Sequence, residues 1–493
     1  MRVIINLYYV LLACLYGGSI MAQNPLIRDQ FSADPTARVF GDRIYIYPSH
    51  DILARPGHGQ PGWFCMQDYH VFSSENLTDW KDHGVILSQY TAPWVDSGSY
   101  SMWAPDCVFK DGKYYFYFPA KKKHAEMGAD KADPTVQNGG VDFGIGVAIS
   151  DHPYGPFKPL EQPLTGVHGI DPNVFIDSDG QPYLYWAEGE IFVAKLKPNM
   201  VELDGKPVVI QHLPAKGLKE GPFVFKRKGI YYLSYPHVAG KTERLEYAVS
   251  DNPMGPFTVK GVIMEATPDC WTNHQSILPY NGQWYLFYHH NDYSPAFDKA
   301  RSICADSLVF NEDGTIKKVQ PTLRGIGITL AGNLIQLDRY SAISKSGAKI
   351  SFLDTLNTFN GWKVTLSSPQ SFVQYNTVDF GQGRNKHLVT RINNINNSKQ
   401  KSRSSRTHND KGGDKRAKKW TTILARINTT TGCHLKVYMD SLEGNEIAAL
   451  TSLKTKGWTI IKAKVSGELS GLHNIYVTNR GAGRVSLDWI KFE

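Results

Sequence analysis

The chain has 493 residues, a formal net charge of +8, an aromatic content of 12% and 26 tyrosines. One ordinary hydrophobic core does not extend over this length, so we expect two domains. The range 393–419 carries nine Lys or Arg and two Asp, a net of +7, which leaves the rest of the chain at +1. The charge therefore argues against a nucleic-acid-binding protein, and the composition favours an all-β fold with many short strands.

Residues 1–22 are predicted to be a secretory signal peptide. One Arg precedes an apolar run from Val3 to Tyr16, and small residues lead to a cleavage site after Ala22. The same run contains LLAC, which is also typical of a bacterial lipoprotein and would place a lipid on Cys14. We expect a secreted or periplasmic bacterial protein, with lipid anchoring through Cys14 as the alternative. No later apolar run is long enough to span a bilayer.

A hairpin pattern recurs five times between residues 23 and 328. Each copy has a polar residue, a short apolar strand, a turn containing Gly and an aromatic strand. The copies are ADPTARVFGDRIYIYPS from Ala33, APDCVFKDGKYYFYFPA from Ala104, IDPNVFIDSDGQPYLYW from Ile170, KEGPFVFKRKGIYYLSY from Lys219 and NHQSILPYNGQWYLFYHH from Asn273. A second element accompanies them, as SDHPYGPF at Ser150 and SDNPMGPF at Ser250. Five such units predict a five-bladed β-propeller over residues 23–328.

One polar position opens the first strand of each copy. It is occupied, or nearly so, by Asp34, Asp106, Asp171, Glu220 and His274. Because the first strand of each propeller blade lines the central channel, we expect these side chains to converge at one mouth of it. Taken singly, each has a structural explanation: an Asp before Pro caps a turn, Asp106 suits a local turn or a contact between blades, and a lone His is usually a core residue. Several acids at one position of consecutive repeats favour a site.

At these motifs the sequence resembles glycoside hydrolase family 43, from Asn24 to about Arg324. The motifs are ADPTARVF, SMWAPD, GIDPNVF, KEGPF and the pair Asn273-His274. The resemblance implies a five-bladed enzyme that hydrolyses glycosidic bonds with inversion, acting mostly on plant polysaccharides that contain arabinose and xylose. It implies that Asp34 is the general base, Glu220 the general acid, and Asp171 a third carboxylate that raises the pKa of Glu220 and orients the sugar. Inversion requires the acid and the base to lie roughly 6.5–9.5 Å apart, which opposite walls of a channel can supply.

The resemblance also suggests secondary site residues. Trp103 is expected to stack on a sugar, with a role in the blade core as the alternative, and Asn273 is expected to contact substrate. Arg301 is expected to reach a substrate hydroxyl, with a structural ion pair as the alternative. His274 resembles a position that helps to hold a hydrated calcium ion in several family members. The chemistry itself requires no cofactor. Pocket shape is expected to depend on the loops 51–67 and 120–141.

Residues 334–493 are predicted to form a β-sandwich, because several segments alternate apolar and polar residues. They resemble a family 6 carbohydrate-binding module, a jelly roll, interrupted by the basic range 393–419, which is predicted to be a solvated loop. The acidic residues that hold a structural calcium in such modules are reduced to Asp338. Trp458 is a candidate sugar platform and Trp489 is expected in the core. A purely structural sandwich is the alternative.

We therefore expect a secreted inverting α-L-arabinofuranosidase or β-xylosidase acting on arabinoxylan. The alternatives are an arabinan- or galactan-active hydrolase of the same fold and a non-catalytic glycan-binding protein. A related five-bladed class that retains configuration on fructans has a different signature from the one around Asp34. The expected partner is a plant cell-wall polysaccharide or oligosaccharide, and a monomer is expected. The cysteines left after signal removal are odd in number and show no zinc-site spacing, which favours buried thiols over a disulfide framework.

Overall fold

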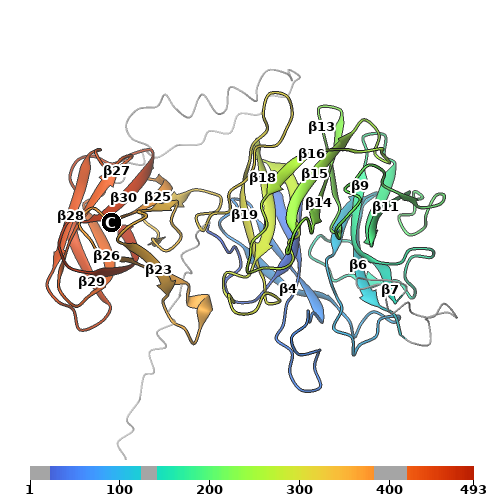
Figure 1. The fold of residues 1–493 in the computed structure, drawn as a ribbon, viewed down its shortest axis with the longest axis horizontal. Helices are drawn as coiled ribbons and strands as arrows, with labels where there is room; N and C mark the ends of the chain where they lie inside the picture. The colour runs from blue at the N-terminus through green and yellow to red at the C-terminus, as the bar shows by residue number, and fades with distance from the viewer. Residues whose placement is uncertain (1–22, 124–141, 382–418) are drawn as a thin grey trace, which may run out of the picture.

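The computed structural model describes residues 23–123, 142–381 and 419–493, and this part of the chain is all-β (Figure 1). Its one helix is the 3-10 turn η2 (Thr358–Asn360). The described residues contain no helix with the length and apolarity that a membrane crossing needs. The predicted signal peptide, the lipid site at Cys14 and the basic range up to residue 418 lie outside the described residues.

Five small antiparallel sheets follow one another in chain order. The first contains β1 (Ala33–Phe40), β2 (Arg43–Ser49), β3 (Asp68–Ser74) and β4 (Lys81–Ser88). The second contains β5 (Asp106–Lys110), β6 (Lys113–Lys121), β7 (Phe143–Ser150) and β8 (Lys158–Pro159). The third contains β9 (Ile170–Ile176), β10 (Pro182–Glu188), β11 (Glu190–Lys195) and β12 (Val208–Val209).

The fourth and fifth sheets complete this N-terminal unit. The fourth contains β13 (Phe223–Arg227), β14 (Ile230–His237), β15 (Arg244–Ser250) and β16 (Thr258–Met264). The fifth has three strands, β17 (Ser276–Tyr280), β18 (Gln283–His290) and β19 (Ser302–Leu308). The segment before β1 runs beside β19, where Leu26 N donates to Ile303 O at 2.8 Å and Ser32 N donates to Arg301 O at 2.9 Å. The N-terminal end of the unit is thus attached to its last strand.

The five recurring hairpins are the first two strands of the five sheets. In three of them both turn residues have positive φ, as in Asp111-Gly112, Lys228-Gly229 and Asn281-Gly282. This is the type I′ geometry, whose twist matches that of the flanking strands and which glycine adopts at little cost. The second recurring motif has a packing role: the buried Tyr47 and Tyr185 donate their hydroxyls to the carbonyls of Pro153 and Pro253 in the following sheets. The second motif therefore joins one sheet to the next.

The first strands are tied to one another by hydrogen bonds between side chains and main chain. In chain order, Thr36 Oγ1 donates to Pro105 O (2.7 Å), Asp106 Oδ2 accepts from Val174 N (2.6 Å), Asn173 Oδ1 accepts from Val224 N (2.9 Å), Gln275 Nε2 donates to Gly221 O (3.0 Å) and Ser276 Oγ donates to Pro35 O (2.6 Å). The last bond returns from β17 to β1. The set closes on itself and brings the opening residues of all five sheets together.

Asp106 is the centre of these contacts. Its fully buried carboxylate accepts two bonds from Arg38 Nη2, at 2.6 and 2.7 Å, and one from Asn173 Nδ2 at 3.1 Å. Arg38 also donates to Val174 O at 3.1 Å and lies 5.0 Å from the ring centre of Phe223. The pair therefore connects β1, β5, β9 and β13, which confirms the contact between sheets predicted for Asp106.

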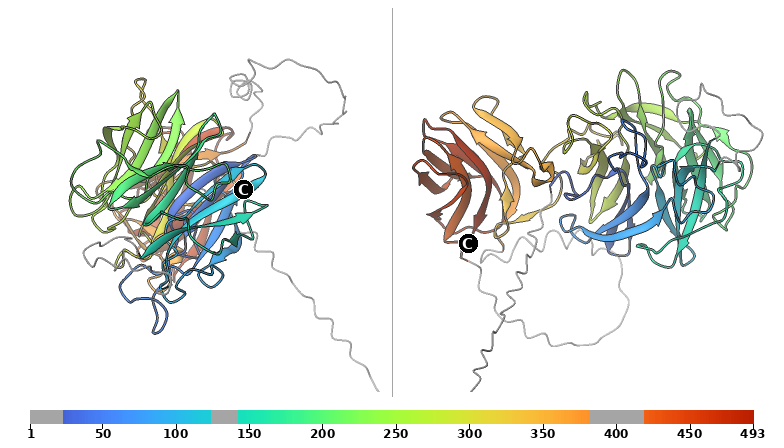
Figure 2. Two further views of the ribbon diagram at one scale, coloured as in Figure 1. Left: turned by 90° about the vertical axis from the view of Figure 1, so that its right-hand side faces the viewer. Right: turned by 90° about the horizontal axis from the view of Figure 1, so that it is seen from below.

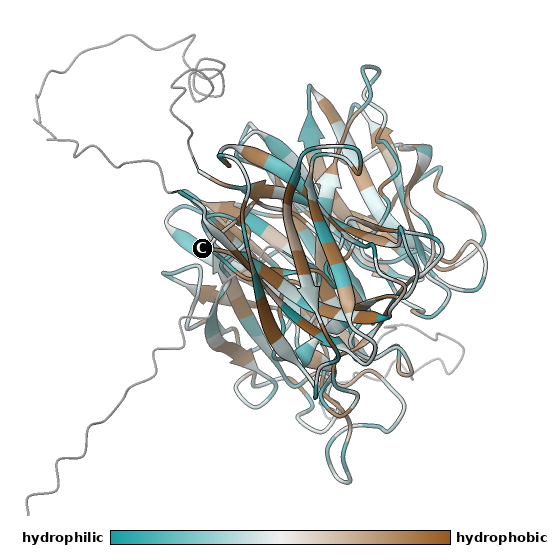
Figure 3. Cartoon of the chain, turned by 90° about the vertical axis from the view of Figure 1, so that its left-hand side faces the viewer, coloured by the Kyte–Doolittle hydropathy of each residue, from teal (hydrophilic) through white to brown (hydrophobic). Residues whose placement is uncertain are grey.

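The C-terminal unit consists of two six-stranded sheets that enclose a second core. One contains β20 (Thr329–Leu330), β22 (Ala342–Ile343), β25 (Phe372–Asp379), β27 (Cys433–Met439), β28 (Glu446–Ser452) and β30 (Leu472–Asn479). The other contains β21 (Ile335–Gln336), β23 (Ala348–Phe352), β24 (Trp362–Leu366), β26 (Thr422–Thr429), β29 (Thr459–Lys464) and β31 (Val485–Phe492). Hydrophobic and hydrophilic residues alternate along its strands (Figure 3).

The two units lie side by side (Figure 2). They make polar and aromatic contacts with one another. Arg339 donates to Tyr293 Oη at 3.0 Å and to the carbonyl of Asn24, and its guanidinium lies 4.5 Å from the ring centre of Trp362. The Tyr293 and Trp362 rings stack with centroids 5.3 Å apart. Buried arginine and stacked rings are specific in geometry, so these contacts fix the orientation of one unit on the other.

The five cysteines among the described residues are free thiols, and all are buried. This agrees with the expectation of buried thiols and shows no disulfide among Cys65, Cys107, Cys270, Cys304 and Cys433.

We predict that Asp106→Asn destabilises the N-terminal unit by about 3–5 kcal/mol, because it leaves the Arg38 guanidinium without its buried counter-charge. Urea unfolding followed by tryptophan fluorescence measures the change. Asp151→Asn is the matched control, because it removes the partner of Lys113 at an exposed site. Equal unfolding midpoints for the two variants would contradict the role of the buried pair.

Candidate active site

All seven residues predicted for the site line one pocket. They are Asp34, Trp103, Asp171, Glu220, Asn273, His274 and Arg301. The first strands bring them together: Asp34 and Asp171 are the second residues of β1 and β9, while Glu220 and His274 shortly precede β13 and β17. Residues separated by as much as half of the chain thus share one cavity.

Asp34 sits at a break in the ladder between β1 and β2, where its φ of 49° departs from the extended backbone around it. Arg301 donates to its two oxygens at 2.8 and 3.2 Å, and Ser49 Oγ donates to Oδ2 at 2.7 Å. Burial acts to raise the pKa of Asp34, but Arg301, aided by His289, His274 and the Ser49 bond, lowers it to about 2. Asp34 is therefore an ionised carboxylate at neutral pH.

Arg301 is held from behind by a second buried carboxylate. Asp51 accepts from its Nε and Nη2, both at 2.9 Å, and from its main-chain N at 2.8 Å. The guanidinium also lies 5.0 Å from the ring centre of Phe64. A planar donor fork between two carboxylates has little freedom. The ion pair expected as an alternative for Arg301 is present, and the residue also lines the pocket.

Asp171 and Glu220 lie in an environment opposite to that of Asp34. Burial, followed by the nearby Glu220 and Asp34, raises the pKa of Asp171 well above its usual value, although Gly221 N donates to its Oδ2 at 2.9 Å. Burial and then a further carboxyl, Glu243, raise the pKa of Glu220 well above its usual value. Among the charged groups that raise the pKa of Glu220, Glu243 has the largest effect. From the sequence, Asp171 was expected to have this role.

Glu243 is the acidic residue that the sequence did not reveal. It immediately precedes β15, it is 1% exposed, and its Oε2 accepts from Asn273 N at 2.7 Å. Its carboxyl lies close enough to that of Glu220 for the two to interact, and burial raises its own pKa to about 8. Because a carboxylate only accepts hydrogen bonds, the two carboxyls can bind one another only when one of them holds a proton. The repeated polar position that identified the other acids opens the first strand of each sheet. Glu243 precedes a third strand, so the repeat could not identify it.

His274 and Asn273 lie beside this carboxyl pair. Burial lowers the pKa of His274 to about 4, with Arg301 acting in the same direction and Asp34 opposing it, so the imidazole is neutral at neutral pH. Asn273 Oδ1 accepts from His274 N at 3.0 Å. Within the described residues, His274 belongs to no group of three converging His, Cys, Asp or Glu side chains. A calcium ion there would rely on water for most of its ligands.

Aromatic rings form part of the pocket wall. Trp103 is partly exposed and packs at a centroid distance of 4.8 Å on Phe143, so it both lines the pocket and joins the core. Trp63, Phe64 and Trp271 also line the pocket. Trp63 and Phe64 belong to the loop 51–67, which was expected to shape it, while most of the loop 120–141 lies outside the described residues. Flat apolar rings beside polar groups suit the faces of a sugar.

Asp338, Trp458 and Trp489 are the residues of the C-terminal unit for which the sequence makes predictions. Asp338 accepts from Trp362 N at 3.0 Å and pairs with Arg339 at 3.3 Å, so its carboxylate is engaged at the contact between units. The guanidinium of Arg426 lies 5.0 Å from the ring centre of the partly buried Trp458. Placing Trp489 in the core was wrong. The register of β31 against β26 shifts between Leu487 and Ile490. The buried side chains therefore change from Val485 and Leu487 to Ile490 and Phe492, and Trp489 is left only partly buried.

A pocket that combines one ionised carboxylate, protonated carboxyl groups and aromatic walls has the chemistry of a glycoside hydrolase. Comparison with known proteins agrees. Residues 22–316 match the family described as glycosyl hydrolases family 43. A xylosidase/arabinosidase of Bacteroides ovatus is 37% identical over 338 residues, which cover 60% of this chain and 97% of that protein. An arabinoxylan arabinofuranohydrolase of Bacillus subtilis (strain 168) is 28% identical over 561 residues, which cover 97% of this chain and 95% of that protein.

Solved structures give the same family. A crystal structure of a family 43 beta-xylosidase/alpha-arabinofuranosidase from a compost microbial metagenome, in complex with xylotriose, has a TM-score of 0.53 and 35% identity. The match covers 61% of this chain and 98% of that one. The chain belongs to glycosyl hydrolase family 43 and is a glycoside hydrolase.

Proposed function

We propose that this enzyme is a secreted arabinofuranosidase or xylosidase that removes arabinose or xylose units from arabinoxylan by a single inverting displacement. The observation that carries the proposal is the opposite electrostatic environment of two buried carboxyls in one pocket. Arg301 holds the pKa of Asp34 at about 2 against the effect of burial, while burial and Glu243 raise the pKa of Glu220 well above its usual value. Environments that push two pKa values apart assign a base and an acid. The named activities of the relatives support the substrate class.

In this proposal Asp34 is the general base. Its carboxylate would accept a proton from a water molecule on one face of the sugar, and the water oxygen would attack the anomeric carbon. Glu220, the general acid, would give its proton to the departing glycosidic oxygen. Asp171, fixed by Gly221 N, would orient the sugar. Trp103, Asn273 and the Arg301 guanidinium would contact substrate, and the ion pair with Asp34 would keep the base in place.

The finer architecture is part of the proposal. The five sheets joined through their first strands support a five-bladed β-propeller over residues 23–328. The two six-stranded sheets support a jelly-roll sandwich over residues 334–493, resembling a carbohydrate-binding module of family 6. The range 1–22 is proposed to direct secretion, with lipid attachment at Cys14 as the alternative. A calcium ion near His274 and a monomeric state are also proposed.

We predict that Asp34→Asn and Glu220→Gln each lower kcat on arabinoxylan by at least about 100-fold, because each removes one of the two proton transfers. Reducing-sugar release measures the change, and circular dichroism verifies folding. A non-catalytic glycan-binding protein would release no sugar before mutation. Near-normal kcat in Glu220→Gln on substrates with poor leaving groups would overturn the assignment of the acid.

We predict inversion at the anomeric carbon, since the proposed base activates water and does not attack the sugar itself. Proton NMR of the first-formed product, recorded before mutarotation, reports the configuration. Release of arabinose or xylose from a panel of aryl glycosides, arabinoxylan, arabinan and galactan identifies the substrate at the same time. A retained configuration would mean that one of the carboxyls acts as a nucleophile.

We predict that Glu243→Gln shifts the alkaline limb of the kcat/KM profile to lower pH. Glu243 raises the pKa of Glu220, so its removal lowers that pKa, and the acid then loses its proton at a lower pH. The acidic limb should move little, because Asp34 is governed mainly by Arg301. Glu246→Gln, at a buried carboxyl outside the pocket, is the control. An unchanged alkaline limb in Glu243→Gln would show that the two carboxyls are not coupled.

A further inference from the structure

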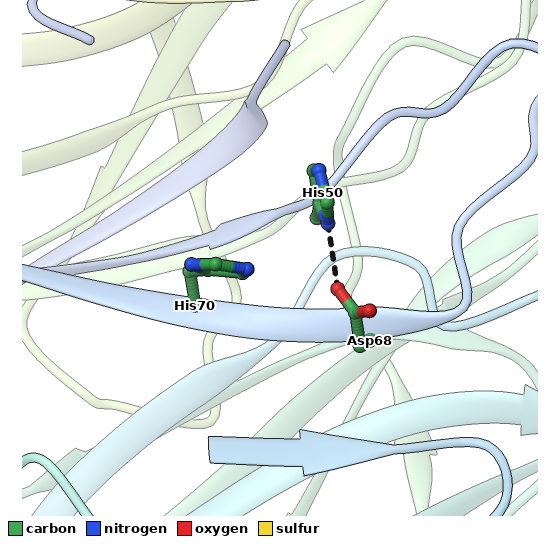
Figure 4. Close-up of side chains that lie close together, drawn as sticks. All are labelled: His50, Asp68 and His70. Carbon is green, nitrogen blue, oxygen red and sulfur yellow. Dashed lines mark hydrogen bonds and ion pairs between the residues drawn. The ribbon is translucent and has the colours of Figure 1, made fainter. Parts of the chain in front are cut away.

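A second cluster of polar side chains lies in the first sheet, outside the lining of the active-site pocket. His50 directly follows β2, while Asp68 and His70 share one face of β3 because they are two residues apart. One ligand atom from each of the three lies within 4.8 Å of the others. Figure 4 shows the His50 ring directed at the Asp68 carboxylate, with the His70 ring beside them. Neither the sequence motifs nor the proposed mechanism uses these residues.

The hydrogen bonds of the cluster define the state of each imidazole. His50 Nδ1 lies 2.6 Å from Asp68 Oδ1, and His70 Nδ1 lies 3.0 and 3.1 Å from the two oxygens of Asp82. Because a carboxylate only accepts, each Nδ1 must carry the hydrogen. His70 Nε2 is therefore left with its lone pair. Asp82 is itself held by Gly84 N at 2.7 Å and by Gln30 Nε2 at 3.2 Å.

Metal-binding histidines in proteins usually have one ring N–H bonded to a carboxylate, while the lone pair of the other ring nitrogen binds the ion. His70 has this arrangement, because Asp82 holds its Nδ1–H and its Nε2 is left with a lone pair. The carboxylate sets the tautomer and fixes the orientation of the ring. We propose that His50, Asp68 and His70 bind Zn²⁺ or a similar divalent transition-metal ion, with Asp82 orienting His70.

The donor set selects the class of ion. Two imidazole nitrogens and one carboxylate suit Zn²⁺, Co²⁺, Ni²⁺ or Cu²⁺, whereas Ca²⁺ and Mg²⁺ require mostly oxygen ligands. The His50 and His70 side chains are 19% and 16% exposed, so water can complete the coordination. As the ion enters, it replaces the hydrogen between His50 Nδ1 and Asp68, and the ring hydrogen transfers to Nε2. Bonds of about 2.0 Å place tetrahedral ligand atoms roughly 3.3 Å apart. His50 Nδ1 and Asp68 Oδ1, now 2.6 Å apart, must therefore separate slightly, and the His70 nitrogen, which lies within 4.8 Å of both, must come to the same spacing.

The site adjoins the groups that hold the base of the active site. Ser49, on one side of His50, donates to Asp34, and Asp51, on the other side, holds Arg301. An ion bound by His50 would thus restrain the segment Ser49–Asp51 and stabilise the folded state by mass action.

Calorimetric titration of the full chain without a purification tag tests the site. After treatment with a chelator, ZnCl₂ is expected to bind at one equivalent per chain, at least about tenfold more tightly than CaCl₂. His50→Gln and His70→Gln should each weaken this binding by more than about tenfold, and Asp82→Asn by about 10–100-fold. The control His152→Gln changes an exposed histidine elsewhere and should bind as the parent does. Zn²⁺ affinity that is unchanged in both His50→Gln and His70→Gln would overturn the proposal.

A second measurement does not depend on the folding of a variant. In the parent chain labelled at histidine, the imidazole NMR signals of His50 and His70 should shift on addition of ZnCl₂, while those of His152 and the active-site His274 stay in place. The melting temperature should rise with ZnCl₂ and return when chelator is added. Shifts confined to histidines other than His50 and His70 would place the ion elsewhere and refute the site.

Discussion

The arrangement of the N-terminal unit depends on the buried pair of Arg38 and Asp106. A carboxylate that is wholly removed from water is costly unless it is paired and hydrogen-bonded, and Asp106, in the second sheet, meets this condition with partners from the first and third sheets. The same bonds bring the first strands of these sheets together. The residues that open those strands then face one pocket. The arrangement of the site therefore depends on the hydrogen bonds that satisfy the buried Asp106 carboxylate.

The pocket itself separates two electrostatic environments over a short distance. On one side, Arg301 lies between Asp34 and Asp51 and supplies a positive charge that cannot be removed at ordinary pH. On the other side, Asp171, Glu220 and Glu243 are buried without a cation among them, so burial and mutual repulsion favour their protonated forms. The carboxyls on the two sides therefore differ in pKa mainly because the Arg301 guanidinium lies beside Asp34.

The sequence predicted what local patterns and repeats encode. The five hairpins and their glycine turns are short-range features, and the repeated polar position identified Asp34, Asp171 and Glu220 because it recurs in register. Two features of the site were not predicted from the sequence. The partner of Arg301 is Asp51, 250 residues away, and Glu243 precedes a third strand outside the repeated position, so only the folded chain brings either into contact. Trp489 was misplaced because strand alternation from Val485 and Leu487 points it inward, whereas an irregularity in β31 between Leu487 and Ile490 changes the buried face.

The attachment of the N-terminal segment to β19 has a consequence for biosynthesis. Asn24 Nδ2 donates to Ala305 O at 3.0 Å across a separation of 281 residues, and β1 cannot acquire its neighbours in the fifth sheet before that sheet exists. Closing so long a loop carries an entropic cost that is recovered only when both ends are present. A nascent chain that has not yet emerged beyond Arg301 therefore lacks the counter-charge of its own Asp34, so the pocket cannot be completed before most of the unit has been synthesised.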